Sequence, residues 1–195
     1  NLFSLSKRTA LITGATGHLG RVISETLAQL GANLIFVDQC EEKLENLSAK
    51  LKESYKTVTY SFLCDLEDQE ARQTLIEKVL DLNTGLDILI NNAAFTGSSN
   101  LEGWSVSFNK QSVSSWKRAI EVNMTAVFEI CQGLSDELSA SGKGVILNIG
   151  SIYGSNAPNW ELYKDTNMSN PAAYAVSKGG LIQFSRWLAT TLAPK

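Results

Sequence analysis

The sequence predicts an α/β fold in which a doubly wound parallel sheet carries helices on both faces. Short apolar runs alternate with longer stretches of helical periodicity, and the apolar runs are nearly continuous, as in strands buried on both sides. Strands separated by helices form right-handed βαβ units, which set the strands parallel. Because 195 residues suffice for one substantial core, we expect a single Rossmann-like domain over residues 1–195.

The first half of the chain contains four predicted strands and three predicted helices. The strands are residues 9–13, 33–37, 57–64 and 86–90, and the helices are residues 18–30, 41–53 and 68–80. Gly31 is placed to end the first helix, because glycine readily adopts the left-handed conformation at a helix C-terminus. Asp68 is a suitable N-cap for the third helix, since its carboxylate can accept from free backbone N–H groups.

The second half is predicted to contain two helices and one strand. A loop over residues 95–111 leads into a long helix over residues 112–139, which Gly142 and Gly144 follow and break. Residues 145–149 form the fifth predicted strand. A final helix begins after Pro171 and runs to about residue 192.

Composition argues against several classes of function. With 17 Lys and Arg against 20 Asp and Glu, the net charge is −3, so no basic surface for nucleic acid is expected. No apolar run has transmembrane length and no secretory signal precedes the first strand, so we expect no membrane partner and a cytoplasmic location. Cys40, Cys64, Cys131 and the single histidine, His18, lack metal-ligand spacing; we expect reduced, mostly buried thiols and no metal site.

A glycine-rich turn joins the first strand to the first helix. Gly14, Gly17 and Gly20 allow positive φ angles and let the backbone approach a pyrophosphate closely. The helix that follows offers free N–H groups and the positive end of its dipole. We therefore expect this turn to bind a dinucleotide, with Thr16, His18 and Leu19 also in the cofactor site.

Asp38 ends the second strand, 18 residues after Gly20. A carboxylate at this point can accept hydrogen bonds from both hydroxyls of the adenosine ribose, and it would repel a 2′-phosphate. Since no basic residue follows within the next few positions, we expect NAD(H) to be preferred over NADP(H).

Tyr174 and Lys178 are four residues apart in the final helix, so both project from one face. An ammonium group near a phenol favours the phenolate, which lets the pair move a proton to or from a substrate oxygen. Ser151 follows the fifth strand, at the edge where an open parallel sheet places its site, and can hold a reacting carbonyl. Together these residues predict acid–base chemistry beside a nicotinamide.

With these segments in place, the chain resembles the short-chain dehydrogenase/reductase family over essentially its whole length. Beyond the glycine turn, the matching segments are Cys64-Asp65-Leu66, Asn91-Asn92-Ala93-Ala94, Glu121-Val122-Asn123, Asn148-Ile149-Gly150-Ser151 and Tyr174-Ala175-Val176-Ser177-Lys178. The resemblance implies that Ser151, Tyr174, Lys178 and Asn123 are catalytic, with Asn123 holding a water of the proton relay.

The same resemblance implies the rest of the cofactor site and the assembly. Asp65 hydrogen-bonds the adenine, Lys178 also contacts the nicotinamide ribose, and Leu66, Asn92, Ala93 and Ala94 complete the cofactor site. A small-molecule substrate and a homodimer or homotetramer are expected.

Three features depart from the common family pattern. The Gly-x-x-Gly-x-x-Gly spacing resembles that of the extended subfamily, which includes sugar-nucleotide epimerases and dehydratases, but the other motifs resemble the short form, so we expect a short-form active site with a variant turn. Ser151 and Tyr174 are 23 residues apart, about ten more than usual, and the extra stretch from Tyr153 to Pro171 is expected to form part of the substrate wall. Family members also continue past the catalytic helix, so we expect the C-terminal strands, roughly 50 residues, to be absent from this chain.

The region from Ser151 to Pro171 further resembles bacterial members tied to flagellin modification and to surface sugars similar to sialic acid. The leading prediction is an NAD-dependent oxidoreductase for a secondary alcohol or ketone that is sugar-derived. Two alternatives stay open: an extended-type epimerase or dehydratase, and a catalytically silent dinucleotide-binding regulatory protein.

Overall fold

The computed structural model describes residues 3–97, 101–166 and 168–193. Its contacts divide the chain into two compact units. The first consists of residues 1–93 and 128–149 and contains the whole sheet. The second consists of residues 94–127 and 150–194 and contains the final helix.

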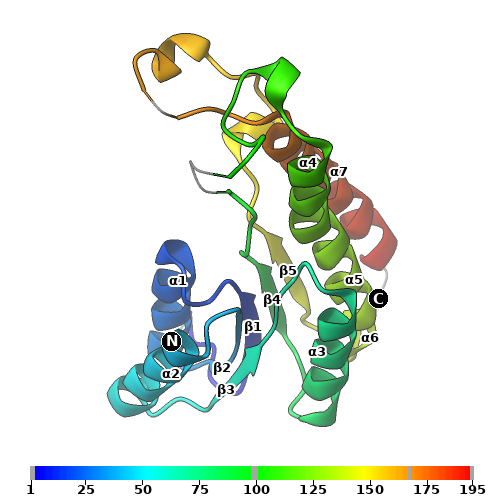
Figure 1. Cartoon of the computed structure of the whole chain (residues 1–195). Helices are drawn as coiled ribbons and strands as arrows, with labels where there is room; N and C mark the ends of the chain where they lie inside the picture. The colour runs from blue at the N-terminus through cyan, green and yellow to red at the C-terminus, as the bar shows by residue number, and fades with distance from the viewer. Residues whose placement is uncertain (1–2, 98–100, 167, 194–195) are drawn as a thin grey trace. The chain divides into compact units, whose positions relative to one another are not determined.

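The first unit is built on a five-stranded parallel sheet, which confirms the predicted fold class (Figure 1). Its strands are β1 (Thr9–Thr13), β2 (Asn33–Asp38), β3 (Thr59–Leu63), β4 (Ile88–Asn91) and β5 (Val145–Asn148). They lie in the order β3-β2-β1-β4-β5, so the chain reverses its direction across the sheet between β1 and β4. This order places the topological switch point between those two strands.

Helices cover both faces of this sheet, and their ends follow local sequence signals. Those of the first unit are α1 (His18–Gln29), α2 (Glu41–Tyr55), α3 (Gln69–Asp81), α5 (Ala126–Gly133) and α6 (Ser135–Ala140). Figure 1 shows α1 and α2 on one face and α3 and α5 on the other. As predicted, Gly31 has φ +90° just past α1, and the Asp68 side chain caps α3 by accepting from the N–H groups of Glu70 and Ala71.

The three central strands, β2, β1 and β4, are buried on both faces, as their continuous apolar sequences predict, whereas the edge strands β3 and β5 are partly exposed. Ile12, Phe36 and Ile90 belong to the core that includes Leu44 and Leu51 of α2. Leu11, Ile35 and Leu89 point to the other face and are fully buried as well. β5 is an edge strand of the described sheet, with Val145 41% and Leu147 48% exposed, and the expected further strands stay a prediction.

The long helix predicted over residues 112–139 is interrupted, which corrects that prediction. It consists of α4 (Val113–Ile120), a π-helical turn over Glu121–Thr125, α5 and α6. In the π turn the Ala126 N–H donates to the Glu121 carbonyl, five residues back. α5 ends at Gly133, where a Cβ would lie 2.8 Å from side-chain atoms of Ile76.

The second unit contains α4, the π turn, α7 (Ala172–Leu192) and three short 3₁₀ turns, η1 (Phe108–Lys110), η3 (Ile152–Gly154) and η4 (Trp160–Tyr163). Pro171 is the N-cap residue of α7, as predicted, and the Ala172 N–H donates to Oε1 of Gln111 at 3.1 Å. The extra stretch between Ser151 and Tyr174 thus includes η3 and η4.

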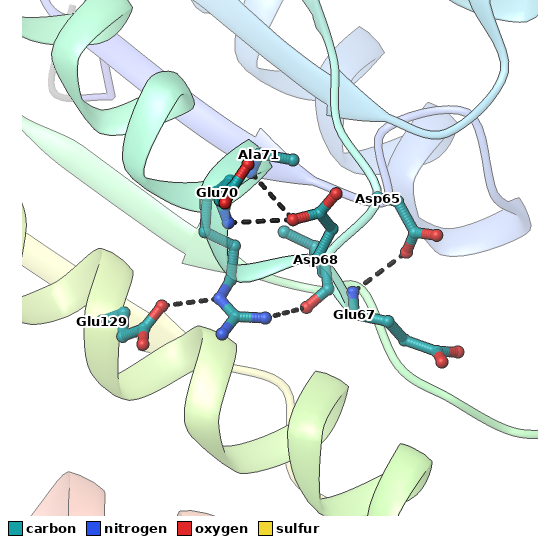
Figure 2. Close-up of polar contacts among 8 residues, drawn as sticks. Asp65, Glu67, Asp68, Glu70, Ala71 and Glu129 are labelled. Atoms are coloured by element: carbon teal, nitrogen blue, oxygen red, sulfur yellow. Dashed lines mark hydrogen bonds and ion pairs between the residues drawn. The ribbon is translucent and has the colours of Figure 1, made fainter.

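A buried ion pair joins α3 to α5 within the first unit. Nε of Arg72 lies 2.6 Å from Oε2 of Glu129, and Nη1 donates to the Leu66 carbonyl at 2.6 Å. The Arg72 side chain is only 1% exposed, whereas that of Glu129 is 22% exposed. Figure 2 shows the Glu129 carboxylate pointing toward this guanidinium, with a dashed line joining the two. A guanidinium buried this deeply needs its partners, because an uncompensated buried charge is costly.

Replacing Glu129 with alanine should lower the free energy of unfolding by about 3 kcal/mol, because Arg72 stays buried without this carboxylate. Glu25→Ala is the matched control: it breaks the exposed pair of Glu25 and Lys50, 3.1 Å apart, and should change stability little. Urea unfolding of both variants measures the difference. If both variants lost the same free energy of unfolding, the buried pair would contribute no more to stability than the exposed pair, which would contradict this prediction.

Candidate active site and cofactor site

The turns after β1 and β4 meet at the switch point of the sheet. Oγ1 of Thr13 accepts from the N–H groups of Asn92 and Ala93, each at 3.1 Å. Nδ2 of Asn92 donates to the carbonyls of Thr13 and Gly14, each at 3.0 Å. The structure therefore brings Gly14, Asn92 and Ala93, predicted as cofactor residues, into one network at the carboxyl ends of two neighbouring strands.

The glycine turn is packed too tightly for side chains at two positions. Gly14 has φ +62°, and a Cβ there would lie 2.9 Å from Cα of Ala93. At Gly20 a Cβ would lie 2.1 Å from the Gly14 carbonyl oxygen. Gly17 is the N-cap residue of α1, and no side chain caps the helix there. The result is a smooth backbone turn that ends in free helical N–H groups, which suits a pyrophosphate.

Asp38 and Thr16, both predicted as cofactor residues, are in direct contact. Oδ2 of Asp38 accepts from the Thr16 N–H at 2.9 Å, and Oδ1 accepts from the Gln39 N–H at 2.8 Å. Each carboxylate oxygen has further lone pairs for ribose hydroxyls. Glu41 and Glu42 lie in the first turn of α2, so two more acidic residues follow Asp38 closely.

The remaining predicted cofactor residues of the first unit have simpler surroundings. Oδ1 of Asp65 accepts from the Glu67 N–H at 2.9 Å, which closes the turn before α3 (Figure 2). Leu66 contributes its carbonyl to Arg72. His18 and Leu19 are exposed at the start of α1, and Nδ1 of His18 lies 3.5 Å from a guanidinium nitrogen of Arg21. In the described part of the chain, no three His, Cys, Asp or Glu side chains gather in a way that could hold a metal.

Tyr174 and Lys178 lie on one face of α7, as the spacing predicts. Lys178 is 2% exposed, and this burial lowers the pKa of its ammonium below the ordinary value. Its Nζ lies 5.9 Å from the centroid of the Tyr174 ring. Tyr174 packs against the cluster that includes Trp104 and Ala173, which holds the ring in place.

Ser151 lies at the N-terminus of η3, where its Oγ accepts from the Tyr153 N–H at 3.2 Å. The η3 turn packs directly on α7. A Cβ on Gly154 would lie 2.7 Å from the Lys178 carbonyl oxygen, so only glycine allows this approach. Close packing of the two backbones sets the segment that carries Ser151 beside the turn of α7 that carries Lys178.

Asn123 is 1% exposed in the π turn and connects two other segments. Its Oδ1 accepts from the Phe95 N–H at 2.7 Å, and its Nδ2 donates to Oγ of Ser177 at 3.0 Å. Ser177 in turn donates to the Tyr174 carbonyl at 2.9 Å. Asn123 therefore fixes the segment after β4 to the turn of α7 that contains Tyr174.

Three residues of this architecture were not predicted: Thr13, Gly154 and Ser177. Each acts through contacts between segments far apart in sequence, which the pattern of a single segment does not show. The clearest available signal was Ser177, which lies inside the Tyr/Lys motif directly before Lys178.

Aromatic side chains gather in the extra stretch between Ser151 and Tyr174. The Tyr163 hydroxyl donates to the Tyr153 hydroxyl, and this contact raises the pKa of Tyr163 to about 12. The Trp160 ring centroid lies 5.9 Å from that of Tyr163. Asn167, which belongs to the stretch expected to form part of the substrate wall, lies outside the described residues.

Comparison with known proteins agrees with this geometry. A family profile described as "short chain dehydrogenase" matches residues 8–195. The chain is 28% identical over 191 residues to the 3-oxoacyl-(acyl-carrier-protein) reductase FabG of Aquifex aeolicus (strain VF5), covering 98% of this chain and 70% of that protein.

Solved structures with the same fold are also similar over nearly the whole chain. An NAD⁺-bound xylitol dehydrogenase has a TM-score of 0.81 and 26% identity, covering 97% of this chain and 66% of its own. The L-sorbose reductase of Gluconobacter frateurii, complexed with NADPH and L-sorbose, has a TM-score of 0.85 and 27% identity, covering 98% and 66%. The chain thus spans about two thirds of the length of these solved relatives.

Among the residues that the structure describes, no helix combines the length and the apolar character that a membrane span requires.

Asn123→Leu should lower the free energy of unfolding by about 1–3 kcal/mol, because it leaves the Phe95 N–H and the Ser177 hydroxyl without their buried partner. Ser177→Ala is the matched control and should cost less, because it removes the contacts to Asn123 and to the Tyr174 carbonyl but leaves the Phe95 N–H bonded to Asn123. Chemical denaturation of both variants tests this order. An Asn123→Leu variant as stable as the parent protein would show that the connection carries no stability.

Proposed function

Since the chain belongs to the short-chain dehydrogenase family, we propose that it is an NAD-dependent oxidoreductase that acts on a secondary alcohol or ketone. The observation that carries this proposal is the buried Lys178 ammonium, 5.9 Å from the Tyr174 ring on one face of α7. A cation held beside a phenol stabilises negative charge on the phenol oxygen, which general acid–base catalysis by tyrosine requires.

In the direction of reduction, each catalytic residue has one task. The nicotinamide, when bound, supplies the hydride. Ser151 donates a hydrogen bond to the carbonyl oxygen and orients it, and the Tyr174 hydroxyl gives that oxygen its proton. Lys178 stabilises the tyrosinate that results, and in the oxidation direction the same groups act in reverse. Asn123 positions the Tyr174 turn through Ser177 and holds a water of the proton relay.

The first unit supplies the residues that would hold the cofactor. The tight backbone at Gly14 and the uncapped start of α1 fit the pyrophosphate, and Asp38 fits the adenosine ribose. The solved relatives include both an NAD⁺-bound and an NADPH-bound protein, so the preference for NAD(H) rests on the charge of Asp38. In this proposal Asp65 hydrogen-bonds the adenine. The remaining cofactor residues are Leu66, Asn92, Ala93 and Ala94.

The proposed substrate is a sugar-derived ketone or alcohol, of the kind used in surface-sugar biosynthesis. The paired hydroxyls of Tyr153 and Tyr163 support it, because the stretch that carries them joins Ser151 to Tyr174 and can line their substrate. Xylitol dehydrogenase and L-sorbose reductase are relatives named for a polyol and a sugar, whereas FabG is named for a 3-oxoacyl substrate. Reduction rates with L-sorbose, D-fructose and acetoacetyl-CoA, measured through NADH absorbance, distinguish a sugar-derived substrate from a 3-oxoacyl substrate.

We also propose that the protein is a homodimer or homotetramer in the cytoplasm.

A second candidate, an epimerase or dehydratase, is favoured by the Gly-x-x-Gly-x-x-Gly spacing of the turn at Gly14. Such an enzyme regenerates its cofactor within one turnover. Net consumption of NADH with stoichiometric alcohol product therefore supports the first function, and converted sugar without net NADH change supports the second.

NADH should bind at least tenfold more tightly than NADPH, because Asp38 repels the 2′-phosphate. Asp38→Asn keeps hydrogen-bonding capacity and removes the charge, so the preference should shrink. Glu42→Gln, in the first turn of α2, is the matched control and should change the ratio less. Fluorescence titration with each cofactor measures the ratio, and tighter NADPH binding by the parent protein would refute the role of Asp38.

Tyr174→Phe should lower kcat by roughly 10²–10⁴-fold while NADH binding is retained, because only the proton-transferring hydroxyl is removed. Lys178→Met should lower kcat and weaken NADH binding together, since Lys178 is also assigned to the ribose. Tyr60→Phe on β3 is the control for loss of a hydroxyl elsewhere and should leave both quantities unchanged. Near-normal kcat in Tyr174→Phe would rule out the proposed mechanism.

A further inference from the structure

A cavity of about 810 Å³ lies in the second unit, beside the first turns of α7. Three segments line it: the loop around η1, the stretch before α7 and α7 itself, which contributes Ala172, Ala175 and Val176. Figure 1 shows the loop around η1 near the N-terminal end of α7. All of the lining residues that the structure describes belong to this one unit.

The cavity opens on a different side of α7 from the catalytic pair. Successive helical residues are rotated by about 100°, so Ala172, Ala175 and Val176 share one side. Tyr174 and Lys178 lie about a third of a turn away from that side. Neither is among the residues that line the cavity, which therefore differs from the face assigned to proton transfer.

The described lining is uncharged and mainly apolar, with five neutral polar residues: Ser105, Ser107, Gln111, Ser169 and Asn170. Large apolar side chains at its edge are well exposed: Phe108 82%, Met168 71%, Trp160 58% and Val176 53%. None of the described lining residues is Asp, Glu, Lys or Arg. Such a lining favours a neutral ligand with a substantial apolar part, because a charge would lose its hydration without gaining a partner.

One buried polar group on the cavity wall lacks a partner. Asn170 is 5% exposed, and neither its Oδ1 nor its Nδ2 forms a hydrogen bond with any residue that the structure describes. A buried amide without partners is unfavourable, whereas most such groups in proteins are satisfied. Both amide atoms are closed to solvent, and because the terminal torsion of asparagine is broad, rotation about Cβ–Cγ is the step that would present them to the cavity.

From these observations we propose that the cavity is a second ligand site, which binds a neutral, apolar molecule carrying a secondary amide. The amide of Asn170 offers one acceptor and one donor group, and a ligand amide offers the complementary N–H and carbonyl. The apolar part of the ligand packs against Trp160 and the neighbouring side chains of the edge. This proposal concerns binding alone and stands or falls independently of the reductase activity.

The test compares N-benzylacetamide with benzyl acetate, an ester of similar shape that lacks the N–H. Binding is followed through the Trp160 indole N–H signal in NMR, which Trp160→Phe identifies among the four tryptophans. The amide should bind the parent protein about tenfold more tightly than the ester, equivalent to about 1.4 kcal/mol. Equal affinity of the two probes, or no shift of the Trp160 signal by either, overturns the proposal without any variant.

Substitutions then locate the interaction. Asn170→Leu has similar volume and lacks the amide, so the tenfold preference should disappear. Ser169→Ala, at the neighbouring lining position, is the matched control and should retain the preference, as should Tyr174→Phe on the other side of α7. A preference that survives Asn170→Leu, in protein shown to be folded by its thermal transition, contradicts the role of Asn170.

Discussion

The parallel pairing of β1 with β4 is the constraint on which the candidate cofactor site depends. Leu11 lies opposite Leu89 in this pair, and Ile12 lies opposite Ile90, so both strands end at the same edge of the sheet. Because the chain reverses direction here, the turns that follow them have no helix between them and can meet. Thr13 joins the two turns, and the backbone at Gly14 fills the space that a side chain would need.

The candidate catalytic residues depend on a second close approach, that of Gly154 to α7. This contact puts the Ser151 segment against the turn of Lys178, and Asn123 holds the same region of α7 through Ser177. Lys178 is buried in this region and its pKa is lowered, at a cost in stability that an exposed lysine would not bear. The strongest argument for function is thus that a cation is buried next to a phenol.

Local sequence signals predicted the strands and several helix ends well, but they did not predict the interruption of the helix over residues 112–139. The strands, the Asp68 cap and the end of α1 at Gly31 follow from periodicity and from single-residue conformational preferences, and all are observed. The helix expected over residues 112–139 looked continuous because its apolar periodicity hardly changes. Neither its π turn nor its end at Gly133, which lies close to the side chain of Ile76, is marked by a change in that periodicity.

In the candidate site, too, local sequence predicted some residues, whereas others depend on contacts between distant segments. Spacing alone placed Tyr174 and Lys178 on one helical face and Asp38 near the glycine turn, where it contacts the Thr16 N–H. Neither Thr13 nor Gly154 could be predicted, because each matters through the backbone of a distant segment. The unpartnered state of Asn170 is likewise a property of packing, and no pattern in the stretch before α7 indicates it.

The most direct test of the central claim is transfer of deuterium to a carbonyl substrate from NADH that carries deuterium at both C4 positions of the nicotinamide. If the protein is the oxidoreductase proposed here, mass spectrometry of the product alcohol will find one deuterium on the carbinol carbon, in proportion to NADH oxidised. NADH that binds but transfers no label to any ketone or sugar in a broad panel would contradict the account, and would favour a dinucleotide-binding protein without turnover.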